Sequence, residues 1–109
     1  MFKNIVIIGF GMIGSSIAQS VMKTNKTASI YAFDKSTTLK QRLKKANLSK
    51  IIPLKSLQEI NQINVDLIIV CTPILQYSSI FKKIDSLNNN KFIVTDVGST
   101  KYNIESLYL

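Results

Sequence analysis

Short runs of apolar residues alternate along this chain with longer segments whose apolar residues recur every three or four positions. The apolar runs predict five strands, at 4–8, 29–33, 51–54, 65–71 and 91–95. The periodic segments predict helices at 12–23, 39–46, 56–63, 74–86 and 101–107. Such alternation is typical of βαβ units, so we expect an α/β fold with a parallel sheet, in a single domain spanning residues 1–109.

The two earliest helices have recognisable inward faces, made of Ile13, Ile17, Ala18 and Val21 in the first and Leu39, Leu43 and Ala46 in the second. Ser36 or Thr37 is expected to cap the second helix, because both are good N-cap residues. Ser56 and Glu59 have the spacing of a capping box. Pro53 weakens the third strand, which we therefore place at an edge of the sheet.

Right-handed crossovers put the first and fourth strands side by side and give the strand order 3-2-1-4-5, a doubly wound sheet of Rossmann type. Ligands of such sheets bind outside the carboxyl ends of the strands, where the strand order reverses. Four loops are predicted to meet at that edge, namely 9–14, 34–36, 71–74 and 96–99. We therefore expect one ligand site there.

The first of these loops contains three glycines, Gly9, Gly11 and Gly14, directly after an apolar strand and at the start of a helix. Gly9 allows the tight turn, Gly11 lets a pyrophosphate approach the backbone, and Gly14 lets the helix pack closely on the strand. The helix N-terminus favours the phosphates electrostatically. Asp34 ends the second strand, where a carboxylate accepts hydrogen bonds from the adenosine ribose. The alternative is a plain glycine turn with a buried or capping aspartate.

The cofactor expected at this site is NAD, because the Asp34 carboxylate would repel the 2′-phosphate of NADP. Lys35 beside it could partly tolerate that phosphate, so NADP stays a less favoured possibility. Thr72 and Pro73 are expected under the nicotinamide, although a strand end followed by proline is also a common structural pattern. The predicted cofactor-binding residues are Gly9, Phe10, Gly11, Met12, Ile13, Gly14, Asp34, Lys35, Cys71, Thr72 and Pro73.

Composition further limits the partners and the catalytic groups that the chain can use. The net charge of +8 comes mainly from scattered lysines, and basic residues cluster only on the second predicted helix, as Lys40, Arg42, Lys44 and Lys45. We therefore expect a diffuse basic surface and no nucleic-acid partner. The absence of a membrane-length apolar run or a signal peptide makes a cytoplasmic, membrane-free protein the default. The single cysteine, Cys71, allows no internal disulfide or metal cluster and is expected to be a small buried hydrophobe. The chain has no histidine, so it cannot supply an imidazole base.

A second motif, Asp-Val-Gly-Ser-Thr-Lys at 96–101, falls on the nicotinamide side of the predicted site. Its hydroxyl and ammonium groups could meet a polar, anionic substrate. Helix capping by Ser99 or Thr100 is an equally sufficient explanation for this segment.

Three blocks of the sequence resemble the amino-terminal half of prephenate and arogenate dehydrogenases. They are IIGFGMIGSSIA at 7–18, DLIIVCTP at 66–73 and VTDVGSTK at 94–101, and their order and spacing match across essentially the whole chain. The resemblance implies oxidative decarboxylation of prephenate or arogenate in tyrosine biosynthesis, with hydride transfer to NAD or NADP. It also gives Ser99 a catalytic role in orienting the ring hydroxyl of the substrate.

The family pattern continues to a histidine and then to a carboxy-terminal helical domain that dimerises, and neither is in this sequence. We therefore expect a nucleotide-binding domain that is inactive alone, from a parent enzyme that is a homodimer. Two alternatives stay open. One is a domain from a relative of the β-hydroxyacid dehydrogenases or pyrroline-carboxylate reductases, which lack the block at 94–101, and the other is a stand-alone, non-catalytic dinucleotide-binding module.

Overall fold

A computed structural model describes residues 2–87 and 92–97 of the chain. They contain a five-stranded parallel sheet with the order β3-β2-β1-β4-β5, which confirms the predicted Rossmann topology. The strands are β1 Asn4–Ile8, β2 Ser29–Phe33, β3 Ile52–Pro53, β4 Leu67–Val70 and β5 Ile93–Asp96. The helices are α1 Met12–Thr24, α2 Leu39–Lys45 and α3 Tyr77–Asp85, with short 3₁₀ helices η1 Leu57–Gln62 and η2 Ile74–Gln76.

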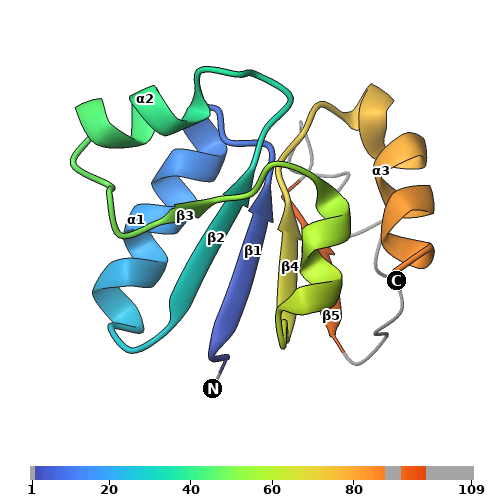
Figure 1. Ribbon diagram of the computed structural model, residues 1–109, viewed down its shortest axis with the longest axis horizontal. Coiled ribbons are helices and arrows are strands. Elements are labelled where there is room, and N and C mark those ends of the chain that lie inside the picture. Colours follow the sequence, from blue (N-terminus) through green and yellow to red (C-terminus); the bar gives the residue numbers. More distant parts are fainter. Residues whose placement is uncertain (1, 88–91, 98–109) are drawn as a thin grey trace.

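The helices form two layers that enclose the sheet (Figure 1). The central strand β1 is buried on both faces, so its side chains alternate between two cores. Ile5 and Ile7 belong to the core that includes residues of α1 and α2. Val6 and Ile8 belong to the core that includes residues of η1 and α3. Because both faces are covered, the faces of the sheet are not open to a ligand, and the loops at the ends of the strands are.

Several local predictions are wrong in detail. Ile13 is half exposed and does not join the core beside α1. Ala46 is exposed, and Leu48 is buried in its place beside Leu39 and Leu43. No side-chain cap is present at α2, which begins after Thr38. The predicted capping box is absent too, since Glu59 accepts the N–H of Lys55 at 3.1 Å and Ser56 makes no side-chain cap.

The remaining elements differ from prediction in extent. The helix expected at 74–86 begins as the 3₁₀ helix η2 and becomes α-helical only at Tyr77. Strand β3 is two residues long and lies at the sheet edge, as Pro53 led us to expect. Within the described residues, no helix is long and apolar enough to span a membrane. The helix predicted at 101–107 lies outside the described residues.

Candidate functional site

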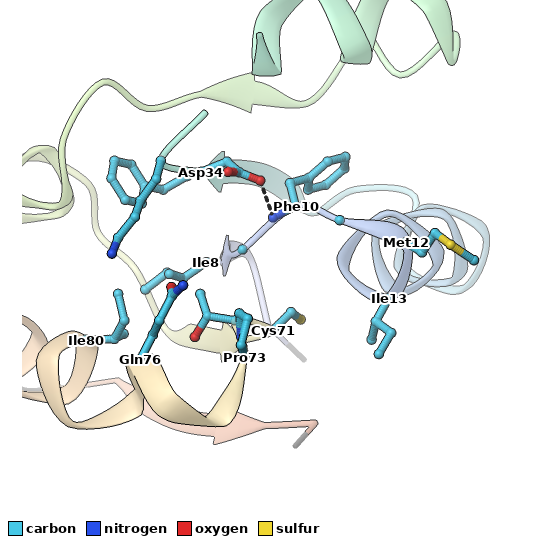
Figure 2. A pocket seen from close by; sticks show the side chains of 14 residues that line it. Ile8, Phe10, Met12, Ile13, Asp34, Cys71, Pro73, Gln76 and Ile80 are labelled. Atoms are coloured by element: carbon cyan, nitrogen blue, oxygen red, sulfur yellow. Dashed lines mark hydrogen bonds between the residues drawn. The ribbon is translucent and has the colours of Figure 1, made fainter. Parts of the chain in front are cut away.

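A pocket of about 530 Å³ opens at the carboxyl ends of β1, β2 and β4 (Figure 2). Three of the four predicted loops supply most of its lining, through residues 9–13, 34–35 and 71–73. The lining is completed by Ile8, Phe33, Gln76 and Ile80. The strand order reverses between β1 and β4, so the pocket lies at the switch point where doubly wound sheets bind ligands.

The three glycines of the first loop differ in whether the fold itself requires a residue without a side chain. Gly9 has a φ of +90°, and a Cβ there would lie 2.8 Å from both the backbone N and the Cγ2 of Thr72. A Cβ on Gly14 would collide with the carbonyl oxygen of Gly9. Both glycines are therefore required by the fold itself, the first by conformation and contact, the second by the close approach of α1 to the turn.

The fold does not require glycine at position 11. A Cβ built on it meets nothing within 4 Å, and its φ of −87° is open to any residue. The residue precedes α1, whose first turn carries no acidic side chain to offset the positive end of the helix dipole. The fold leaves this space empty of protein atoms at the place where a phosphate could approach the helix N-terminus.

Asp34 follows β2 and is held against the glycine turn. Its Oδ2 accepts the backbone N–H of Phe10 at 2.9 Å, as drawn in Figure 2, and its Oδ1 accepts the N–H of Ser36 at 3.0 Å. Arg42 on α2 donates from Nη2 to the same Oδ2 at 3.1 Å and from Nη1 to the carbonyl oxygen of Phe10 at 2.6 Å. The carboxylate is thus fixed in position from three directions.

These contacts also settle the charge of Asp34. Burial by itself raises the pKa of this carboxyl, but the hydrogen bonds from Ser36, Arg42 and Phe10 and the charge of Arg42 together outweigh burial and leave the pKa below its usual value. Asp34 is therefore an ionised acceptor at neutral pH. A carboxylate offers about four lone-pair sites, and three are occupied here, which leaves acceptor capacity toward the pocket.

The opposite wall of the pocket comes from the end of β4. The Oγ1 of Thr72 is buried and has no hydrogen-bond partner among the described residues. Burial raises the pKa of the neighbouring Cys71 thiol to about 12, with a further contribution from the negative charge of Asp96. Cys71 is thus a neutral, half-buried thiol, which fits a wall residue and not a nucleophile.

Asp96 ends β5 beneath this wall and is the one buried charged side chain among the described residues, at 3 % exposure. Burial raises its pKa, and the hydroxyl of Tyr77 partly offsets that effect. Asp96 does not line the pocket. The rest of the second motif, including Ser99, lies outside the described residues, so its assigned role stays a prediction.

The structure brings together at one pocket all the predicted cofactor residues except Gly14, which lies behind the turn. Sequence reasoning missed the role of Arg42, which it counted only as one member of a basic cluster on the second helix. It also missed Gln76, whose side chain reaches toward Ile8 in Figure 2. No described group of three or more His, Cys, Asp or Glu residues could hold a metal ion.

The doubly wound sheet, the open position at Gly11 and the ionised Asp34 define a dinucleotide-binding domain of the Rossmann class. Residues 17–107 match the family described as "Prephenate dehydrogenase, nucleotide-binding domain". The chain belongs to this family, as the three blocks of its sequence predict.

Individual relatives agree with this assignment. The chain is 34% identical to a prephenate dehydrogenase of Lactococcus lactis over 107 residues, which are 96% of this chain and 29% of the relative. It is 26% identical to a cyclohexadienyl dehydrogenase of Zymomonas mobilis over 104 residues, 95% of this chain and 35% of that protein. The chain thus spans about a third of the length of these relatives.

Among solved structures, the chain is similar to prephenate dehydrogenase from A. aeolicus in complex with hydroxyphenyl propionate and NAD+. The TM-score is 0.76 at 26% sequence identity, with 98% of this chain and 38% of that chain covered. The fold is also that of Synechocystis arogenate dehydrogenase, with a TM-score of 0.71 at 24% identity, covering 93% of this chain and 34% of that one.

Proposed function

We propose that this domain binds NAD in preference to NADP and serves a prephenate or arogenate dehydrogenase acting in tyrosine biosynthesis. One observation carries the proposal: Gly11 faces open space next to a carboxylate that the protein holds ionised. A pyrophosphate fits the first feature, and ribose hydroxyls fit the second. The A. aeolicus relative with a similar fold is a complex with NAD+.

Each part of the pocket then has a task. The turn at Gly11 and the first N–H groups of α1 receive the pyrophosphate, because those groups have no acceptor within the helix. Asp34 accepts hydrogen bonds from the ribose and disfavours a 2′-phosphate in the same place. Thr72 and Pro73 form the wall on the nicotinamide side. When bound, the dinucleotide supplies the acceptor for the hydride released in oxidative decarboxylation.

The substrate chemistry requires more than these residues. The 109 residues include no histidine, and the pocket is open to solvent at the edge of the sheet. General acid–base assistance typically contributes about 10²–10⁴ in rate. We propose that the chain alone binds cofactor without turning over prephenate, and that a longer, homodimeric protein completes the site. Steady NADH formation by the purified chain with prephenate and NAD would contradict this.

Calorimetric titration with NAD and NADP tests the binding proposal. Gly11→Val should abolish NAD binding and leave the fold intact, because its side chain enters space that no protein atom occupies. Ser20→Val is the matched control, since Ser20 is exposed on α1 and its side chain makes no hydrogen bond in the described structure. Equal or tighter binding of NADP by the wild-type chain would refute the NAD preference.

A further inference from the structure

Arg42 occupies an unusual position beside the candidate ribose site. It extends from α2 to the glycine turn, where Nη1 donates to the carbonyl oxygen of Phe10 at 2.6 Å and Nη2 donates to Asp34 at 3.1 Å. Its side chain is 39% exposed. The guanidinium is therefore fixed in position beside the glycine turn, unlike a solvated surface cation. Part of it is still exposed, so it could contact a ligand.

The ion pair alters what Asp34 presents to a ligand. The two opposite charges are 3.1 Å apart, so each largely neutralises the other locally. Lys35, which is exposed, lines the same pocket and adds another positive charge. A 2′-phosphate at Asp34 would therefore lie close to two cations, Arg42 and Lys35. One of them, Arg42, is already paired with Asp34.

We propose that Arg42 is a specificity-determining residue, and that its ion pair with Asp34 keeps it from binding the 2′-phosphate of NADP. This inference rests on the proposed dinucleotide site. While Asp34 is charged, its carboxylate occupies Nη2 and leaves acceptor capacity for the ribose hydroxyls of NAD. When that charge is removed, Nη1 keeps its bond to the Phe10 carbonyl, and Nη2 is held only by a neutral acceptor, which a charged phosphate can displace. Arginine suits this ligand, because its planar fork matches phosphate oxygens.

This proposal and the simpler hypothesis, in which Asp34 alone excludes the 2′-phosphate, predict different effects of substitution. If Asp34 only repels the phosphate, its neutralisation should relieve the repulsion whether or not Arg42 is present. If Arg42 is a latent phosphate ligand, the gain in NADP affinity should require Arg42. A double-mutant cycle on the two positions distinguishes these cases.

The cycle uses Asp34→Asn, Arg42→Met and the double variant. Asparagine keeps the shape of aspartate and an acceptor for the N–H of Phe10, and methionine keeps part of the apolar stem of Arg42. Lys44→Met is the matched control, because it removes an exposed positive charge from the same helix without touching the turn. Binding of NAD and NADP is measured by calorimetry at low ionic strength, and folding is checked by circular dichroism.

Asp34→Asn should tighten NADP binding by at least about tenfold, the size of one charge-assisted hydrogen bond. The double variant should lose that gain, and Arg42→Met alone should bind NADP no better than the wild type. Lys44→Met should follow the wild type.

Two results would overturn the proposal: a double variant that binds NADP as tightly as Asp34→Asn, or an Asp34→Asn chain with no gain. In either case NAD binding by the wild type would leave the proposed function standing. A wild-type chain that binds neither dinucleotide would refute both.

Discussion

Gly14 offers a quantitative test of how closely α1 packs against the glycine turn. A Cβ at this position collides with the carbonyl oxygen of Gly9 and lies 3.5 Å from the Cγ2 of Ile7. The Gly9 carbonyl cannot move away easily, because Gly9 has a positive φ and its N–H donates to the carbonyl oxygen of Phe33 at 2.7 Å. Gly14→Ala must therefore displace the helix.

The magnitude follows from two opposing effects. Overpacking typically costs about 1–3 kcal/mol, and a backbone partner in a fixed turn argues for about 3 kcal/mol. Alanine regains about 1 kcal/mol of helix propensity over glycine. The net loss of stability is then about 2 kcal/mol, which corresponds to a fall in Tm of about 8–16 °C for a domain of this size.

Gly11→Ala is the matched comparison, since the same methyl group is added three residues away in open space. It should lower Tm by only a few degrees, because the cost at an N-cap position is at most about 1 kcal/mol. Thermal unfolding followed by circular dichroism measures both variants. An unchanged or raised Tm for Gly14→Ala would refute the close packing of α1 on the turn.

Three further predictions concern titration, reactivity and catalysis. The pKa of Asp34 is lowered on folding, so the carboxylate stabilises the fold at pH values above its unfolded pKa, and this stabilisation is lost as the pH falls through its folded pKa. The stability difference between wild type and Asp34→Asn, measured by urea unfolding, should therefore shrink below about pH 4. A difference that stays constant with pH would contradict this. With its pKa raised to about 12, Cys71 should react slowly with a thiol reagent at pH 8 in the folded chain and rapidly in urea, whereas equal rates would contradict its burial. In the longer protein, Ser99→Ala should lower kcat/KM at least about tenfold if the serine orients the substrate, and should cost only about 1 kcal/mol of stability, with kinetics intact, if it is merely a cap.

The sheet was predictable from the sequence because its determinants are local. The apolar runs that form β1 and β2 are found with the predicted bounds, and right-handed crossovers then leave little freedom in the strand order. The glycine turn was equally predictable, since a positive φ at Gly9 and the contact at Gly14 require residues without a side chain. Both belong to backbone geometry that short sequence patterns encode.

Side-chain partners across the fold were less predictable. Arg42 donates a hydrogen bond to the carbonyl oxygen of Phe10, which lies 32 residues away in the sequence. The helical pattern around Arg42 shows only a basic face and could not predict this contact. Ile13 has the spacing of a buried residue, but it lines the open pocket at the end of the sheet. The one sequence signal for Arg42 was its position on the helix that directly follows Asp34.

The most direct test of the account is to map where NAD binds on the isolated chain. Backbone amide chemical shifts should be recorded by NMR during a titration with NAD. We predict NAD-induced shift changes concentrated at residues 9–14, 34–36, 71, 72 and 74, and no such changes when NAD is added to Gly11→Val. Shifts confined to the opposite edge of the sheet, around the pocket of about 370 Å³ that includes Met22 and Ile52, would contradict the assignment of the site, as would an unchanged spectrum.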